Sequence, residues 1–337
     1  MVINNVDVNN EVLIIAEIGN NHEGSYTLAE EMIGLVAETG AQAVKFQTIV
    51  PELFIASKDQ KRIQQLKKYQ LSYNQFEKLA NYSKKEGLIF MSTPFDLDSV
   101  QFLNSIVPAF KIASSDNTFY PLIEKVALTE KPIILSTGLA GFNEINKSVN
   151  FINEIWKNNN IKGKLALLHC VSNYPTNRSD ANLLSIEYLK NKFPNCTIGY
   201  SDHTLGVDAA ITSVVLGARI IEKHFTINKN HSEFRDHQIS ADPQELKEIV
   251  ERVKYTQELL GEKLLKITSD EQKISSALRR SIAAKTDIPK GHTITIDDII
   301  WVRPACGFLV GEEDKVIGKK TKSNIVLGEI IELKHLT

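Results

Sequence analysis

Apolar and polar residues alternate along the chain in a regular way from residue 13 to about residue 262. Short runs rich in β-branched residues predict buried strands, and apolar residues spaced three or four apart predict helices. The predicted strands are Leu13–Ile18, Ala43–Phe46, Leu88–Ser92, Phe110–Ala113, Pro132–Ser136, Leu165–Cys170, Thr197–Ser201 and Arg219–Phe225. The predicted helices are Leu28–Thr39, Tyr73–Glu86, Leu97–Ser105, Pro121–Leu128, Glu144–Asn158, Leu183–Lys192, Val207–Leu216 and Pro243–Leu260.

This alternation predicts an α/β protein with a parallel sheet, and eight repeats in about 250 residues predict closure into a (β/α)8 TIM barrel. An open, doubly wound sheet is the alternative. That fold would need a glycine-rich dinucleotide turn after the first strand, and Ile18–His22 is not one. The polar segment Ser57–Gln70 follows the second strand, where we expect either a lid over the active face or a solvated loop.

The pattern changes after Gly261. We expect a barrel domain over residues 1–262, a polar linker over 263–277, and a small, mostly β module over 278–337. Gly291 and Gly328 occupy similar turns between short apolar runs in this module. A module of about 60 residues buries little apolar surface on its own, and we therefore expect it to dock onto a barrel.

Composition excludes several classes of protein. Apolar residues make up 42% and charged residues 24% of the chain, and a net charge of −2 gives no electrostatic basis for binding nucleic acid or an anionic membrane. No apolar run is long enough to span a bilayer, and Met1–Asn10 does not resemble a secretory signal. Cys170, Cys196 and Cys306 lack paired or metal-type spacing, so we expect buried free thiols in a cytoplasmic protein.

Polar residues capable of catalysis or binding end nearly every predicted strand. The carboxyl ends of barrel strands form one face, so such residues would converge there. A purely structural role is reasonable for any one of them, but it does not explain the whole set. The residues are Glu17, Lys45, Gln47, Ser92, Thr93, Lys111, Ser114, Ser136, His169, Ser172, Asn173, Tyr174, Ser201, Asp202, His203, Glu222, Lys223 and His224.

Two lysines with several hydroxyls suit a small anion that carries phosphate and carboxylate groups. His203 and His224 end neighbouring strands, so their imidazoles can reach one divalent ion and leave open positions for water and substrate. The alternative is that each histidine only makes structural hydrogen bonds. We expect that structural role for the isolated residues His22, His231, His292 and His335.

Nine short motifs resemble those of the sialic acid synthase family, and they occur in order at the strand ends. The tail also resembles the antifreeze-like (SAF) module of these synthases, through Arg279–Ala284, Ile288–Gly291 and Trp301–Pro304. The resemblance covers essentially the whole chain. The barrel motifs are Ile15–Gly24, Ala43–Gln47, Ser92–Phe95, Phe110–Ser114, Leu135–Gly138, Leu168–Cys170, Asn173–Pro175, Gly199–Thr204 and Ile221–Thr226.

The resemblance implies condensation of phosphoenolpyruvate with open-chain N-acetylmannosamine or a related acylamino sugar, giving a nine-carbon α-keto acid and phosphate. It implies a catalytic carboxylate at Glu17 and a divalent metal on His203 and His224, usually Mn²⁺, with Mg²⁺ or Co²⁺ as alternatives. Glu222 would orient metal-bound water. Phosphoenolpyruvate would be held by Lys45, Lys111, Ser114, Ser136, Ser172 and Ser201. The sugar would be contacted by Gln47, Asp116, Tyr174, Asp236 and, from the module of a domain-swapped partner in a homodimer, Arg303.

Departures from the family pattern fall around the expected sugar site. Ser115–Asp116 replace a Gly-Glu pair, Ser172 stands where Asn is usual, and 230–237 is one residue longer than its counterpart. N-acetylneuraminate is therefore the default product, with legionaminic acid or another nonulosonic acid as the alternative. Synthases of 3-deoxy heptulosonate or octulosonate type generally lack the tail module, and a carbohydrate- or ice-binding protein would leave the strand-end residues unexplained.

Overall fold

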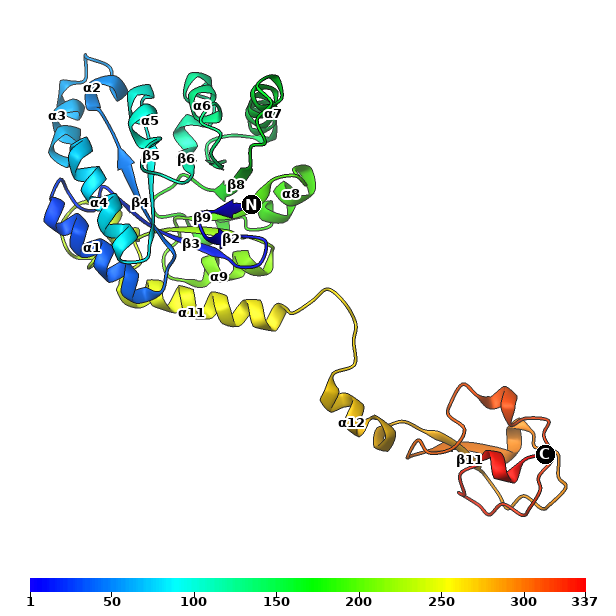
Figure 1. Cartoon of the computed structure of the whole chain (residues 1–337). Helices are drawn as coiled ribbons and strands as arrows, with labels where there is room; N and C mark the ends of the chain where they lie inside the picture. The colour runs from blue at the N-terminus through cyan, green and yellow to red at the C-terminus, as the bar shows by residue number, and fades with distance from the viewer. The chain divides into compact units, whose positions relative to one another are not determined.

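The computed structural model covers residues 1–337, and it describes every side chain except that of Arg235. The chain divides into two compact units, Met1–Gly261 and Glu262–Thr337. Each unit has its own hydrophobic core. We describe the two units separately (Figure 1).

The first unit is built on eight parallel strands, as the sequence predicts. They pair in the order β5-β4-β3-β10-β9-β8-β7-β6, and the edge strands β5 and β6 lie side by side, so the sheet forms a nearly closed barrel. Nearly all residues of these strands are buried, as expected for strands covered by helices on the outside. The strands are β3 (Leu13–Gly19), β4 (Ala43–Thr48), β5 (Ile89–Pro94), β6 (Phe110–Ile112), β7 (Ile133–Ser136), β8 (Leu165–Cys170), β9 (Thr197–Asp202) and β10 (Ile220–His224).

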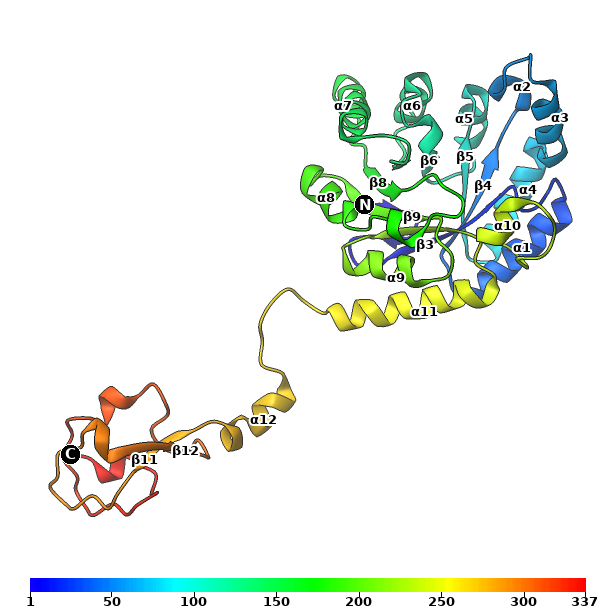
Figure 2. The same ribbon diagram turned by 180° about the vertical axis from the view of Figure 1, so that it is seen from behind.

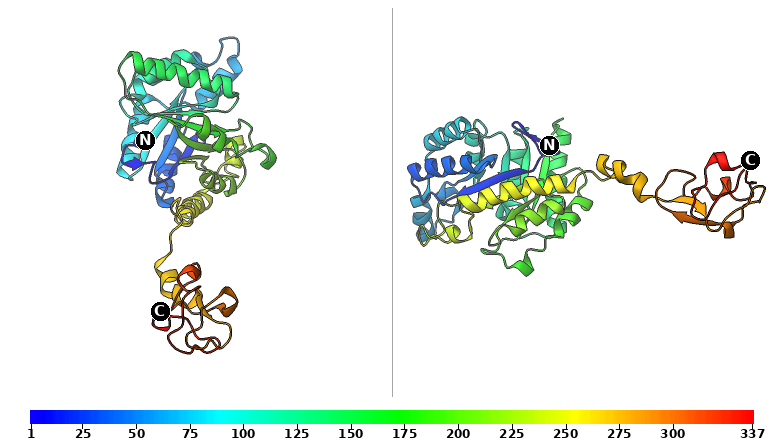
Figure 3. Two further views of the ribbon diagram at one scale, coloured as in Figure 1. Left: turned by 90° about the vertical axis from the view of Figure 1, so that its right-hand side faces the viewer. Right: turned by 90° about the horizontal axis from the view of Figure 1, so that it is seen from below.

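Helices surround the sheet, and the predicted ones agree with the structure to within two residues at each end. The last of them, α11, packs against α1 and α9 and completes the ring (Figures 1 and 3). Asp242 caps α11 by accepting a hydrogen bond from the amide of Glu245. The helices are α1 (Tyr26–Thr39), α4 (Tyr73–Lys85), α5 (Leu97–Leu103), α6 (Tyr120–Ala127), α7 (Phe142–Asn158), α8 (Ser185–Lys192), α9 (Asp208–Val215) and α11 (Pro243–Leu260).

Several shorter elements were not expected from the sequence. The segment Ser57–Gln70 is not a solvated loop, because it contains the ten-residue helix α3 (Gln60–Tyr69). Ile63 and Leu66, three residues apart, are the buried side chains of this otherwise polar helix, and Asp59 caps it. The other short elements are α2 (Pro51–Phe54), α10 (Arg235–Ile239, Figure 2) and the 3-10 turns η1 (Ser114–Asp116) and η2 (Arg178–Asp180).

A hairpin of β1 (Val2–Ile3) and β2 (Val6–Asp7) precedes the barrel. Its buried side chains Ile3, Val6 and Val8 join residues of the barrel interior, such as Ile15 and Met91, in one apolar cluster. The interior is therefore packed with side chains at the amino end of the strands. Only the carboxyl end is left to hold polar groups.

The second unit is small and contains β structure, as predicted. Its strands β11 (Ser281–Ala284) and β12 (Ile299–Val302) pair antiparallel, and Gly291 and Gly328 both adopt the left-handed conformation at φ +83° and +80°. The stretch expected as a linker contains helix α12 (Ser269–Leu278). The remaining elements are the 3-10 turns η3 (Ile296–Asp298), η4 (Glu313–Lys315) and η5 (Leu333–His335).

The three cysteines are free, but they are not all buried as expected. Cys170 is buried, Cys196 is half-buried and Cys306 is exposed. Cys306 lies four residues after the end of β12, outside the apolar core of the small unit. In the described part of the chain, no helix is both long and apolar enough to cross a membrane.

Candidate active site

The strand ends enclose a cavity of about 420 Å³, which we call the reaction cavity. Most of the residues expected at the site line it together, although they come from all parts of the first 224 residues. Those that line it are Glu17, Lys45, Gln47, Lys111, Ser114, Ser136, Ser172, Tyr174, Ser201, His203, Glu222 and His224. The parallel register explains the convergence, because Glu17 on β3 lies beside both Lys45 on β4 and His224 on β10.

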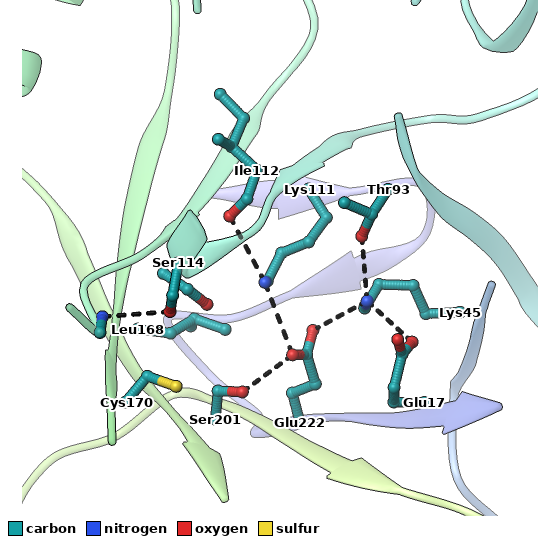
Figure 4. A network of polar contacts seen from close by, with 12 residues as sticks. Glu17, Lys45, Thr93, Lys111, Ile112, Ser114, Leu168, Cys170, Ser201 and Glu222 are labelled. Atoms are coloured by element: carbon teal, nitrogen blue, oxygen red, sulfur yellow. Dashed lines mark hydrogen bonds and ion pairs between the residues drawn. The ribbon is translucent and has the colours of Figure 1, made fainter. Parts of the chain in front are cut away.

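Buried charges form a connected network at the floor of this cavity (Figure 4). Lys45 Nζ lies 2.7 Å from Glu17 Oε2 and 3.6 Å from Glu222 Oε2, and it donates a hydrogen bond to Thr93 Oγ1 at 3.0 Å. Lys111 Nζ lies 3.5 Å from Glu222 Oε1, which also accepts a hydrogen bond from Ser201. Burying so many charges is costly, so this cluster is better explained by function than by stability.

The two carboxylates of this network differ in their surroundings. Burial raises the pKa of Glu17 to about 7, because its single lysine partner, Lys45, does not fully offset the loss of water and the repulsion from Glu222. Burial would also raise the pKa of Glu222, but Lys111, Lys45 and the hydrogen bond from Ser201 lower it instead. Near neutral pH one carboxyl group can therefore hold a proton while its neighbour is ionised, which suits proton handling at Glu17.

The opposite wall of the cavity is shaped to receive an anion. Ser114 Oγ accepts a hydrogen bond from the amide of Gly138 at 3.1 Å. A Cβ atom at Gly138 would lie 2.4 Å from Ser172 Oγ and 2.7 Å from Ser114 Oγ, so only glycine fits between these hydroxyls. The buried Oγ of Ser136 has no hydrogen-bond partner among the described residues. Hydroxyls and lysines are thus left to bind phosphate or carboxylate oxygens.

His203 and His224 lie together at the rim of the cavity, with ring centroids 5.5 Å apart. His203 Nδ1 lies 2.8 Å from the carbonyl oxygen of Val171, and donation to this oxygen leaves Nε2 with a lone pair. Burial, with the positive charges of His203 and Lys45, lowers the pKa of His224 well below its usual value, and its buried Nδ1 has no hydrogen-bond partner in the described structure. Cys170 and the hydrogen bond to Val171 raise the pKa of His203 against the effect of burial. His224 therefore offers a lone pair directly, whereas His203 must lose a proton before it can bind a divalent metal.

The described side chains contain no group of three or more His, Cys, Asp or Glu residues arranged around one point as metal ligands. A metal at this site would take two protein ligands and keep its remaining positions for water and substrate. Tyr174 packs against His203 with ring centroids 4.1 Å apart and the ring planes tilted by 32°, which restricts the orientation of the imidazole.

A second and larger pocket of about 770 Å³, which we call the outer pocket, adjoins the reaction cavity. Gln47 lines both, and it donates to Glu17 Oε1 and accepts from Asn20 Nδ2. Asp236, at the start of α10, lines the outer pocket but not the reaction cavity.

Two expected sugar-binding residues are not among those that line the two pockets of the first unit. Asp116 is half-buried in η1, where it accepts a hydrogen bond from Ser115 Oγ, and it is not among the residues that line either pocket. Arg303 is exposed on the second unit, directly after β12.

Sequence reasoning missed the residues of α3 and of the segment before α10 that line the outer pocket. These include Arg62, Gln65, Tyr69 and Phe234. The apolar spacing of Ile63, Leu66 and Tyr69 is a helical signal, but the polar residues around it obscured that signal. His169, by contrast, has a structural role, because its Nε2 lies 2.8 Å from the carbonyl oxygen of Ala181.

A TIM-like barrel whose strand ends carry these polar residues, followed by a small β domain, is typical of the nonulosonic acid synthases. The chain belongs to the NeuB family, whose model matches residues 32–264, and residues 279–337 match the SAF domain. It is similar to an uncharacterized protein of Methanocaldococcus jannaschii, with 43% identity over 94% of this chain and 92% of the relative. It also resembles the N,N'-diacetyllegionaminic acid synthase of Campylobacter jejuni, with 36% identity over 95% of this chain and 99% of that enzyme.

A solved structure supports the same assignment. The crystal structure of N-acetylneuraminic acid (sialic acid) synthetase from Leptospira borgpetersenii, in complex with citrate, superposes with a TM-score of 0.76. The two proteins are 36% identical, and the match covers 81% of this chain and 94% of that one.

Proposed function

We propose that this protein condenses phosphoenolpyruvate with the open-chain form of an N-acylated amino sugar of the mannosamine type. The observation that carries the proposal is the pairing, in one cavity, of a lysine and hydroxyl cradle with two carboxylates in opposite protonation environments. The cradle suits an anion with phosphate and carboxylate groups, and the carboxylates suit a reaction that develops positive charge.

In the proposed reaction, Lys45, Lys111 and the hydroxyls near Gly138 bind and orient phosphoenolpyruvate. Its C3 attacks the aldehyde carbon of the sugar, and water then adds to C2, which has developed positive charge. Cleavage of the C2–O bond releases phosphate. Glu17 lies at the floor of the cavity, where it can stabilise that positive charge and move the proton lost by water. Holding two reactants in register is the larger task, which accounts for the many positioning groups.

His203 and His224 would hold a divalent cation, for which Mn²⁺ is the first candidate and Mg²⁺ or Co²⁺ the alternatives. Such an ion polarises a bound aldehyde oxygen. Glu222 lies two residues before His224 and within reach of both lysines. Its negative charge raises the pKa of each lysine, which burial lowers, and it would also orient metal-bound water. Tyr174 packs against His203 and would help to hold its ring in place.

N-acetylmannosamine, giving N-acetylneuraminate, is the first sugar candidate. A second candidate is 2,4-diacetamido-2,4,6-trideoxymannose, which would give N,N'-diacetyllegionaminic acid. The similarity to the Campylobacter enzyme over 95% of the chain favours this second candidate. Either sugar would be contacted by Gln47, Tyr174 and Asp236. Asp116 does not line the reaction cavity, so it would influence the sugar without lying on the cavity wall.

We also propose that the protein is a domain-swapped homodimer, in which Arg303 reaches the sugar site of the partner barrel. None of the ten described residues of α12 is buried. Large apolar side chains are exposed along 262–278, including Leu265, Ile267, Ile274 and Leu278. A partner surface would cover them. The reaction would take place in the cytoplasm, where free thiols such as Cys306 remain reduced.

The test is phosphate release from phosphoenolpyruvate with Mn²⁺ and either sugar. A Lys111→Met variant, which keeps the side chain's length but not its charge, is the matched control. We expect release with at least one sugar and almost none from the variant. The absence of release with every acylamino sugar would refute the function, and release by the variant at the wild-type rate would refute the anion site.

A further inference from the structure

Asp202 and Lys223 lie near the carboxyl ends of the neighbouring strands β9 and β10, but neither side chain lines the reaction cavity. Their sequence neighbours Ser201 and Glu222 do line it. Because side chains alternate along a strand, Asp202 and Lys223 point to the outer side of the barrel. They stand opposite each other in the register of the two strands, and each is 1% exposed. They form a buried charge pair that the proposed reaction does not use.

The layer around this pair is otherwise apolar. Ile221 and Phe225, which lie two residues to either side of Lys223, are fully buried in the main hydrophobic cluster. Tyr200, two residues before Asp202, belongs to the same cluster. Replacing a buried ion pair by apolar residues of similar volume often leaves stability unchanged or improves it. Stability alone therefore does not account for charged residues at these two positions.

The carboxylate of Asp202 closes a tight turn around the next residue, His203. Its Oδ1 accepts hydrogen bonds from the backbone amide and the hydroxyl of Thr204, both at 2.8 Å, and from the Tyr200 hydroxyl at 3.2 Å. Its Oδ2 accepts from Lys223 Nζ at 2.8 Å, and the same ammonium group donates to the carbonyl oxygen of Thr204. An aspartate that accepts from the amide two residues on forms an Asx turn, which restricts the backbone of the residue between them. Here that residue is His203.

The backbone of His203 is bonded in turn to the loop that carries Tyr174. The amide of Thr176 donates to the carbonyl oxygen of His203 at 2.9 Å, and the Thr176 hydroxyl donates to the carbonyl oxygen of Asn173 at 2.9 Å. In this loop the Tyr174 ring packs against the imidazole of His203, with centroids 4.1 Å apart. One turn is thus connected to an expected metal ligand and to an expected sugar contact.

We propose that Asp202 is a positioning residue. Its carboxylate oxygen, oriented by Lys223, holds His203 and the loop of Tyr174 in the geometry that the metal and the sugar require. This inference rests on the proposed function and adds to it two residues that touch neither reactant.

Phosphoenolpyruvate binding should not depend on this turn. Lys45, Lys111 and Ser136, which would bind phosphoenolpyruvate, lie on β4, β6 and β7, and none of these strands contains the turn. A change in the turn should therefore affect metal binding and sugar use more than phosphoenolpyruvate binding. A general loss of stability would not separate the ligands in this way.

The experiment compares two double variants that both lack the buried ion pair. Asp202→Asn with Lys223→Met keeps an oxygen that can accept from the amide of Thr204, whereas Asp202→Leu with Lys223→Met does not. Electron paramagnetic resonance of free Mn²⁺ measures metal binding without turnover, and the phosphate-release assay gives the KM of each substrate. We expect the asparagine variant to bind Mn²⁺ as the wild type does. The leucine variant should bind it more than about tenfold more weakly, with a higher KM for the sugar and an unchanged KM for phosphoenolpyruvate.

Equal Mn²⁺ binding by the two double variants would overturn the inference. Ile221→Ala, which opens a cavity in the same apolar layer, is the control for stability. It should lower the melting temperature and leave Mn²⁺ binding unchanged; if it weakened Mn²⁺ binding as much as the leucine variant, the effect would belong to stability. Should the leucine variant not fold, Asp202→Ala with Lys223→Met takes its place, with the same expectations.

A further measurement needs neither metal nor substrate. The nuclear magnetic resonance signal of the His203 ring, assigned with the variant His203→Ala, should shift in the leucine variant and stay in place in the asparagine variant. An unshifted signal in the leucine variant would also overturn the inference. The absence of phosphate release with every acylamino sugar would refute the proposed function, whereas this comparison tests the turn by itself.

Discussion

Lys45 Nζ lies 2.7 Å from Glu17 Oε2 at the buried floor of the barrel mouth. This contact joins β3, the first strand of the barrel, to β4 and links Glu17 to the ion network around Glu222. It does not fully stabilise the ionised form of Glu17, because burial disfavours the charge and Lys45, which Glu17 shares with Glu222, only partly offsets that effect. The pKa of Glu17 is raised as a result, and the free energy of unfolding should therefore depend on pH.

Stability should depend on pH through Glu17. Burial raises its folded-state pKa to about 7 from an ordinary value of 4.5. As pH rises through this window the unfolded chain loses the proton first, so the stability of the wild type should fall between these values and then level off. Glu17→Gln lacks this titration, so the variant should gain relative to the wild type by about 1 kcal/mol or more. Urea denaturation across the window measures the difference, and a variant that gains no stability relative to the wild type as pH rises would contradict the pKa assignment.

Removing either rim histidine should weaken metal binding. We expect His203→Ala and His224→Ala to bind Mn²⁺ more than about tenfold more weakly, because each loses one of two protein ligands. Electron paramagnetic resonance of free Mn²⁺ measures binding without any turnover. His292→Ala, in the second unit beside Asp298, is the control and should bind as wild type. Unchanged binding in both rim variants would remove these histidines from the metal site.

The contact between Gly24 and α3 predicts a large effect of a single methyl group. Gly24→Ala should displace α3, because its Cβ would lie 2.0 Å from a backbone oxygen, and should lower the melting temperature and raise the KM of the sugar. Gly87→Ala is the matched control, since Gly87 has φ +80° with nothing within 4 Å of its Cβ. This control measures the cost of the left-handed conformation alone, about 1 kcal/mol. If the two variants lose the same stability, α3 does not rest on Gly24.

The exposed apolar residues of 262–278 predict an oligomer. Replacing Leu265 and Ile274 by Asp should shift the protein from dimer to monomer, because a charged group would be buried at the contact. Light scattering after size-exclusion chromatography reports the mass. Gln272→Ala, an exposed polar position on α12, should remain a dimer. A wild-type protein that is monomeric at high concentration would refute the proposal, and with it the role of Arg303.

The barrel was predictable because its strands, such as Leu13–Gly19, are buried along their whole length and alternate with well-capped helices. The reaction cavity followed from the same regularity, since parallel strands bring Glu17, Lys45 and His224 to one end. Helix α3 was missed because its buried side, Ile63 and Leu66, is too short to outweigh its polar residues. The outer pocket depends on tertiary contacts such as that between Tyr69 and Phe234, 165 positions apart, and no local pattern carries that information.

The hairpin that packs into the amino end of the barrel also affects the path by which ligands can enter and leave the reaction cavity. With Ile3 and Val6 packed into the interior, the reaction cavity opens only at the carboxyl end. Under the proposed function, phosphoenolpyruvate would lie at the bottom of a closed well and the sugar above it. The lower ligand must then arrive first, and the released phosphate must wait until the sugar-derived product moves aside. Under the proposed function, the packed amino end of the barrel therefore predicts an ordered steady-state mechanism.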